Sequence, residues 1–229
     1  MKRIVIAALV MMSGLCQAQT MAVDSFASQL QMTPNAQLVD VRTAAEFAEG
    51  HLANAKNLDV RQPDFNQAVA QLDRKRPIFV YCLSGGRSKT AAEQLRAMGY
   101  GPVYEMGGGY LKWTSRLMPV EGVARSDKRS QWTLQRLDSL VKAQPLVLVD
   151  VYAPWCPPCK KMAPTIDKLA TEWAGKAVIL KVDADAEKSL LQSLTVDELP
   201  TILLYRNGKL VGRHIGFQEE KALRAMLSE

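Results

Sequence analysis

Two cysteines separated by two residues are the groups in this sequence most able to do chemistry. Cys156 and Cys159 follow an apolar run over 146–151, which indicates a buried strand, and precede a helical pattern. The N-terminus of a helix stabilises negative charge and therefore a thiolate on the first sulfur. Thiolates attack disulfides, so the spacing predicts redox chemistry. Half of a zinc site is the other interpretation, but no further Cys or His ligands lie nearby in the sequence.

A third cysteine, Cys82, stands at a second junction between an apolar strand and a helix. The loop after it consists of Leu83, Ser84, Gly85, Gly86 and Arg87. Its two glycines allow backbone N–H groups to curl around the sulfur, and Arg87 adds positive potential. Such a loop would stabilise a thiolate, a persulfide or an oxyanion. A buried structural cysteine before a glycine turn is the simpler interpretation, and the loop alone leaves both open.

One carboxyl group, Asp150, lies within the apolar run before the Cys156 pair. Ionising a carboxyl among Leu and Val side chains costs free energy, so we expect burial to raise the pKa of Asp150. The alternative is that Asp150 ends the strand at the surface. The apolar pattern continues through Val151 and Tyr152, which favours burial.

The elements that must position these groups alternate between strand-like and helix-like patterns in the first half. Strands are expected at 37–41, 77–81 and 102–104, helices from Thr43 and over 88–98, and a turn at 107–109. Thr43 with Glu46 three residues later is the pattern of a capping box, and Gly99 marks the end of the second helix. Repeated strand–helix units predict a mostly parallel sheet with helices on both faces.

The second half continues the α/β pattern. We expect a helix at about 130–143, the strand at 146–151, the helix after Cys156, a strand at 177–182, a helix near 187–194, a hairpin over 201–215 and a helix at about 219–227. Residues 118–128 show no period and contain Pro, Gly and Ser, as linkers do. The predicted division is an export signal at 1–18, a first domain at 19–120, a linker at 121–128 and a second domain at 129–229.

The N-terminal segment has the pattern of a secretory signal. Met1-Lys2-Arg3 is basic, residues 4–15 are apolar, and cleavage after Ala18 would leave Gln19 as the first residue. A lipoprotein acylated at Cys16 is disfavoured because bulky Leu15 precedes that cysteine. The sequence therefore predicts export, which in a bacterium means the periplasm.

Charge and cysteine count narrow the function further. Cleavage would lower the net charge from +6 to +4, and no basic stripe interleaved with aromatic residues is present, so nucleic-acid binding is not expected. Three cysteines would remain in the mature chain. An odd number of cysteines cannot all pair, so a scaffold held by disulfides is not indicated. Three cysteines with chemical roles agree better with this count. We expect no cofactor and no metal.

The second half resembles the thioredoxin family over about 128–229. The resemblance rests on the run from Leu148 to Lys160, on Pro164, on Lys181-Val-Asp183, on Leu199-Pro200-Thr201, and on Asn207-Gly208 with Gly212 and Gly216. It implies that Cys156 is the exposed nucleophile, covered on one side by Trp155, and that Cys159 resolves the mixed disulfide.

The same resemblance implies roles for residues outside the cysteine pair. Pro200 would follow a cis peptide that turns the backbone of Leu199 toward a bound substrate strand. Asp150, with Lys181, would assist proton transfer at Cys159. The dipeptide between the cysteines is Pro-Pro instead of the Gly-Pro of reducing thioredoxins, so reductant and oxidant or isomerase remain open.

The first half resembles a rhodanese (sulfurtransferase) domain over about 25–119. The resemblance rests on Leu38-Val-Asp40-Val-Arg42, on the run from Glu46 to Ala55, on the Cys82 loop, and on Gly107-Gly-Gly-Tyr-Leu-Lys-Trp113. It implies that Cys82 carries a persulfide cradled by residues 83–87, with catalytic Arg87, and that Asp40 and Arg42 organise the site. The loop from Cys82 to Arg87 is six residues long, which fits sulfur transfer. Leu83 lacks the positive charge seen in good thiosulfate users.

Together the two resemblances imply an exported bacterial protein of two α/β domains: a three-layer rhodanese-like domain with a parallel sheet, and then a thioredoxin fold. The expected activity is thiol–disulfide exchange coupled to sulfur transfer. Expected partners are protein thiols and disulfides, a sulfane-sulfur donor and a membrane thiol reductant of the DsbD type. Alternatively, the first domain only recruits a partner, or the dithiol is an oxidant or isomerase.

Overall fold

The computed structural model describes residues 19–123 and 130–228 of the 229-residue chain. The predicted export signal at 1–18 lies outside the described residues, as does most of the predicted linker at 121–128. Within the described ranges, no helix has the length and apolar composition needed to cross a bilayer.

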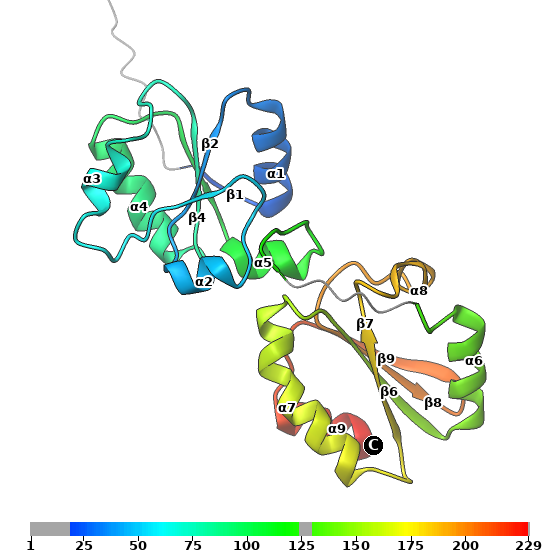
Figure 1. Ribbon diagram of the computed structural model, residues 1–229. Helices are drawn as coiled ribbons and strands as arrows, with labels where there is room; N and C mark the ends of the chain where they lie inside the picture. Colours follow the sequence, from blue (N-terminus) through cyan, green and yellow to red (C-terminus); the bar gives the residue numbers. More distant parts are fainter. Residues whose placement is uncertain (1–18, 124–129, 229) are drawn as a thin grey trace, which may run out of the picture.

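The first domain is built on a five-stranded parallel sheet, as the strand–helix repeats predict (Figure 1). The strands lie in the order β1-β5-β4-β2-β3. In chain order its elements are β1 (Gln19–Met21), α1 (Val23–Met32), β2 (Gln37–Asp40), α2 (Ala44–Ala48), β3 (Lys56–Asn57), α3 (Phe65–Val69), β4 (Ile78–Tyr81), α4 (Gly86–Ala97), β5 (Val103–Met106) and α5 (Gly109–Ser115).

Helices cover both faces of this sheet because successive side chains of each strand point to opposite sides. In β4, Phe79 and Tyr81 pack into the same apolar cluster as Phe26 of α1. Ile78 and Val80 pack into a separate cluster with α3 and α4. The predicted three-layer arrangement is therefore confirmed.

The second domain has a four-stranded sheet in the order β7-β6-β8-β9. Its elements are α6 (Leu134–Ala143), β6 (Leu146–Tyr152), α7 (Pro157–Glu172), β7 (Val178–Asp183), α8 (Lys188–Ser193), β8 (Thr201–Arg206), β9 (Lys209–Ile215) and α9 (Glu220–Ser228). Strand β6 is parallel to β7 and antiparallel to β8, and β8 and β9 form the predicted hairpin. Helices α7 and α9 cover one face, and α6 and α8 the other.

Several elements are absent from the predictions. Helices α1, α3 and α5 and the short strands β1 and β3 were not expected, and 107–109 was expected as a turn only. Helix α5 is seven residues long and begins after Gly108 in the left-handed region, with no side chain capping it. A helix this short depends on tertiary packing more than on local pattern, so its sequence carries little signal.

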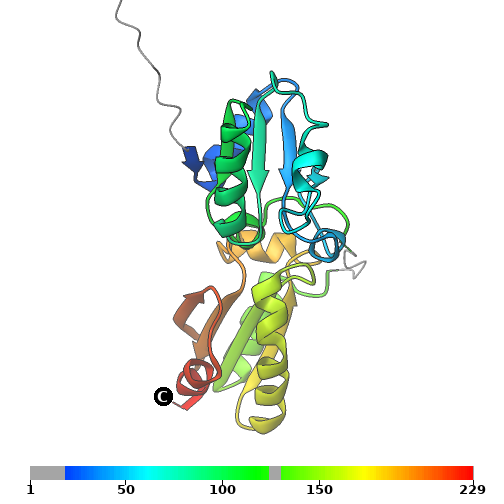
Figure 2. The same ribbon diagram turned by 90° about the vertical axis from the view of Figure 1, so that its left-hand side faces the viewer.

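The two domains meet end to end, with α2 and α5 on the side of the first domain that faces the second (Figures 1 and 2). The carboxyl ends of β2 and β4 precede α2 and the Cys82 loop on that side. The backbone N–H of Leu199 donates to the carbonyl oxygen of Ser115 across the interface, over 2.7 Å. The interface is thus formed by the end of the first domain where loops follow strands, which is the usual place for sites in parallel sheets.

Candidate active site

The cysteine pair lies at the junction of β6 and α7, as the sequence predicts. Cys156 is the N-cap of α7 and forms a disulfide with Cys159, with 5.2 Å between the two Cα atoms. The amide of Cys159 donates to Sγ of Cys156 over 3.3 Å. Pro157 occupies the start of the helix, where the N–H that proline lacks has no helical partner in any case. The sulfur of residue 156 therefore stands where helix amides favour a thiolate.

The exposure expected for Cys156 is not observed. Its exposed fraction is 0%, and that of Cys159 is 4%. One apolar cluster contains Cys156, Trp155 and Leu199 and continues into Tyr110 and Trp113 of the first domain. Packing of the first domain against this side of the second is the physical reason for the difference.

The other residues expected around the dithiol lie near the end of the sheet where β6 stops and β8 starts. The Leu199–Pro200 peptide is cis, as expected. Pro200 directly precedes β8, whose first residue, Thr201, pairs with Val151 near the end of β6. The indole of Trp155 is buried and donates from Nε1 to Oδ2 of Asp185 over 2.8 Å. Their roles in substrate binding stay predictions.

Asp150 is buried, and this burial raises its pKa to about 7, against a smaller lowering by Lys181. Among the described residues, no hydrogen-bond partner reaches its Oδ1 atom. Asp150 lines, together with Cys159 and Lys181, a cavity of about 120 Å³. That volume admits water, so a proton could pass between the carboxyl and the resolving sulfur. The Lys181 ammonium itself pairs with Asp167 over 2.8 Å.

The Cys82 loop forms a tight cradle between β4 and α4. The amide of Gly85 donates to Sγ of Cys82 over 3.2 Å, and Cys82 is 1% exposed. Gly85 has φ +101°, a conformation that favours glycine, and it is the N-cap of α4. One backbone amide of the loop therefore reaches the sulfur, and the cradling role expected for Leu83, Ser84 and Gly86 stays a prediction.

Arg87 is held beside this loop by a carboxylate from α2. Its guanidinium donates to both carboxylate oxygens of Glu46, over 2.7 and 2.8 Å. This pair lowers the pKa of Glu46 to about 2, and the same hydrogen bond raises the pKa of Arg87 against the desolvation that lowers it. Glu46 also completes the predicted capping box with Thr43. The Glu46 carboxylate therefore caps the N-terminus of α2 and also orients Arg87.

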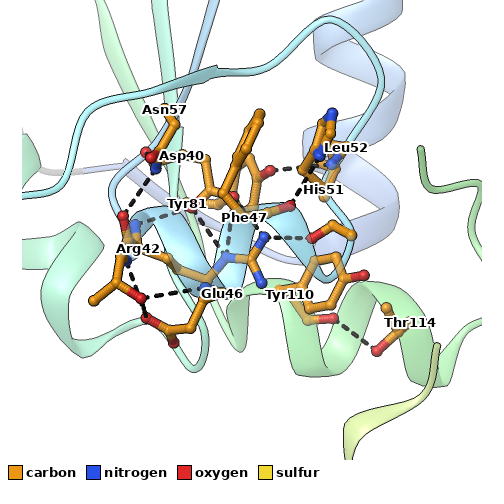
Figure 3. A network of polar contacts seen from close by, with 12 residues as sticks. Asp40, Arg42, Glu46, Phe47, His51, Leu52, Asn57, Tyr81, Tyr110 and Thr114 are labelled. Atoms are coloured by element: carbon orange, nitrogen blue, oxygen red, sulfur yellow. Dashed lines mark hydrogen bonds and ion pairs between the residues drawn. The ribbon is translucent and has the colours of Figure 1, made fainter. Parts of the chain in front are cut away.

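Asp40 and Arg42, expected to organise the site, lie in the domain interior (Figure 3). Arg42 donates to both oxygens of Asp40 and to the carbonyl of Gly50, and its guanidinium lies 4.1 Å from the ring centre of Tyr110. Asn57 donates to the Asp40 and Arg42 carbonyls. Both residues are buried, so the geometry shows them supporting the neighbouring elements, and their expected part in substrate binding stays a prediction.

Two supports of the Cys82 loop were not anticipated from the sequence. The Ser88 hydroxyl, at the start of α4, lies 2.6 Å from the buried carboxylate of Glu105. The first amides of α5 also reach the loop, where Tyr110 donates to the Cys82 carbonyl and Leu111 to that of Leu83. Neither Glu105 in β5 nor the glycines at 107–109 has a sequence pattern that indicates these contacts.

Helix α2 connects the two sulfur centres. Glu46 on α2 holds Arg87, and Glu49, three residues later, pairs with Lys160 next to Cys159 over 3.2 Å. Helix α5 makes a second connection, since its first amides hold the Cys82 loop and its last carbonyl accepts from Leu199. Both centres therefore lie at the same domain interface.

This fold and site define a class: a dithiol redox domain of thioredoxin fold that follows a sulfurtransferase-type domain with one cysteine. Comparison with known families agrees. The model of the family "Thioredoxin" matches residues 130–229, and that of "Rhodanese-like domain" matches 23–116. The chain belongs to the thioredoxin family and carries a rhodanese-like domain before its thioredoxin domain.

Individual relatives cover the second domain. The thioredoxin of Staphylococcus aureus is 39% identical over 82 residues, which are 36% of this chain and 79% of the relative. Among solved structures, Plasmodium falciparum thioredoxin is 29% identical and covers 44% of this chain and 96% of its own, with a TM-score of 0.39. A mutant thioredoxin from Halobacterium salinarum is 31% identical and covers 46% and 93%, with a TM-score of 0.39.

Proposed function

We propose that the protein is an exported thiol–disulfide oxidoreductase that acts as a reductant, and that Cys82 supplies it with sulfur as a persulfide. The observation that carries the proposal is the placement of both sulfur centres at one interface, tied by Glu46 of α2 and by Glu49, which caps the end of that helix. The two domains support thiol redox and sulfurtransferase-type activity in general. Their contact at the reactive ends supports a joint reaction.

The reaction proceeds in three balanced steps. The Cys82 thiolate takes a sulfur atom from a sulfane-sulfur donor and releases the donor's thiolate or sulfite. The Cys156 thiolate then attacks the outer sulfur of the Cys82 persulfide, which frees Cys82 and leaves the persulfide on Cys156. Finally Cys159, deprotonated with help from Asp150, attacks the inner sulfur of Cys156 and expels hydrosulfide. Two electrons pass from the dithiol to the sulfane sulfur, and the Cys156–Cys159 disulfide remains.

A thiol reductant must then reduce the disulfide for the next cycle. The apolar segment at 4–15 after a basic start supports export to the periplasm, where a glutathione pool does not supply electrons. We therefore assign this step to a membrane thiol reductant of the DsbD type. Because Leu83 is uncharged, a persulfide donor fits the loop better than thiosulfate does.

Two single substitutions test the division of labour. Cys82→Ser removes the sulfur acceptor and is expected to abolish persulfide formation, seen by mass spectrometry, while reduction of insulin disulfides continues. Cys156→Ser is expected to abolish insulin reduction and to leave the Cys82 persulfide intact. Absence of a Cys82 persulfide in the otherwise active protein would contradict the coupled function and favour a recruitment role for the first domain.

The direction of electron flow is measured by equilibrating the dithiol with a glutathione couple. A reductant is expected near −270 mV, roughly the value of thioredoxin, whereas a value near −120 mV would identify a disulfide-forming oxidant.

A further inference from the structure

The last turn of α5 binds a backbone N–H group next to the dithiol. The carbonyl of Ser115, the final residue of α5, accepts from the N–H of Leu199 over 2.7 Å. Leu199 is 1% exposed, and it leads into β8 beside the end of β6. Because this N–H already has a partner within the chain, an extended segment of another protein cannot pair with it until Ser115 withdraws.

Ion pairs hold the same contact from both sides. Glu198, next to Leu199, lies 3.0 Å from the ammonium of Lys112 and 3.7 Å from the guanidinium of Arg116, both on or just after α5. At the other side, Lys160 pairs with Glu49 over 3.2 Å. The charges of the two domains are therefore complementary around the dithiol.

Molecules outside the protein have little access to the Cys156–Cys159 disulfide. Cys156 has no exposed surface, and the cavity of about 120 Å³ beside Cys159 has room for water but not for a protein segment. An attacking sulfur must approach a disulfide along its S–S axis, so a protein disulfide or dithiol cannot react with this arrangement as it stands.

We propose that the docked rhodanese-like domain is the resident partner of the dithiol and excludes other proteins from it. In the closed form the first domain covers the dithiol, and external proteins react with it only after the interface opens. This inference rests on the proposed function, because it names the first domain as the preferred partner of the dithiol. The protein is accordingly a poor general reductant of protein disulfides while it is closed.

Charge reversal at the interface tests the proposal in the full-length chain. Glu198→Lys, and separately Lys112→Glu with Arg116→Glu, should open the interface by breaking the ion pairs of Glu198 from opposite sides, and the second variant also removes the pair of Arg116 with Asp24 inside the first domain. Combining all three substitutions restores opposite charges and should close it. Glu220→Lys is the matched control, because Glu220 also contacts two cations, Lys168 and Arg224, but between α7 and α9.

The first readout is the rate at which a water-soluble phosphine reduces the Cys156–Cys159 disulfide, followed by thiol trapping and mass spectrometry. Both opened variants should react about three- to tenfold faster than wild type, the range that two partly exposed ion pairs support. The triple variant and the control should react like wild type. Equal rates in all five proteins would overturn the proposal.

The second readout is insulin reduction at equal dithiol content, which should rise in the opened variants by a similar factor. Wild type that reduces insulin as fast as the opened variants would contradict the exclusion of other proteins. If no variant reduced insulin at all, the proposed reductant function would fail, whereas the phosphine rates would still decide whether the interface covers the dithiol.

Discussion

At the residue scale, Asp150 has the most strongly environment-dependent chemistry. Burial raises its pKa from 3.8 in the unfolded chain to about 7 in the folded protein. Between these values the folded state holds the extra proton, so stability falls as pH rises through this window. Above about pH 7 the protein contains a buried carboxylate without a hydrogen-bond partner at Oδ1 among the described residues.

Replacement of Asp150 by Asn should therefore stabilise the protein at about pH 8, by on the order of 3 kcal/mol, and have little effect at about pH 4. Urea unfolding at the two pH values measures this difference. The same variant should release hydrosulfide more slowly, since Cys159 loses its proton acceptor. An equal change of stability at both pH values would show that Asp150 is not buried as a titrating acid.

Some site residues could be predicted from the sequence and others could not. Cys156, Cys82 and Asp150 stand in strand–helix junctions or apolar runs, where their types are conspicuous, but the burial of Cys156 by the first domain did not follow from the pattern. Asp40 and Arg42 are apparent as a polar pair, but only the fold shows that they bind each other inside the domain. The long-range partners of Arg87 and Ser88 have no local signature.

At the scale of elements, α5 fixes the Cys82 loop by close backbone approach. Gly109 has φ +55°, and a Cβ atom there would collide with the carbonyl of Cys82 and lie 2.8 Å from the carbonyl carbon of Leu83. Because backbone atoms cannot move aside cheaply, any larger residue at 109 must displace the loop.

We expect Gly109→Ala to slow persulfide formation at Cys82 by roughly tenfold to a hundredfold, as a displaced reactive group does. Gly99→Ala is the matched control, since Gly99 also has a positive φ, +83°, but open space around its Cβ position. The free energy of unfolding of both variants should fall by about 1–2 kcal/mol, because alanine is strained in the left-handed conformation. Equal persulfide rates per folded molecule, measured by mass spectrometry, would show that α5 does not set the loop.

Most regular elements followed from local pattern. The capping box at Thr43, the stop at Gly99 and the Asn207-Gly208 turn each have a local physical cause, and the structure confirms them. Helices α1 and α5 lack such causes: α1 has no side-chain cap, and α5 is held by packing and by the Cys82 loop. Their existence is decided by tertiary contacts.

At the scale of the whole molecule, the interface was the feature least accessible from sequence. Two domains and a linker follow from composition and periodicity, but nothing in a single chain indicates that Glu198 meets Lys112 or that Ser115 meets Leu199. These contacts join residues far apart in sequence. They place the Cys82 loop and the dithiol at one interface between the domains.

The most direct test of the coupled reaction follows one sulfur atom within the chain. In a Cys159→Ser variant the resolving thiol is missing, so sulfur that passes from Cys82 should stop on Cys156. The variant is reduced, loaded at Cys82 with a sulfane-sulfur donor, freed of excess donor, and digested after thiol trapping. Transfer within one molecule predicts that the extra sulfur moves to the peptide of Cys156 at a rate independent of protein concentration. Sulfur that remains on the Cys82 peptide while Cys156 is a free thiol would contradict the account.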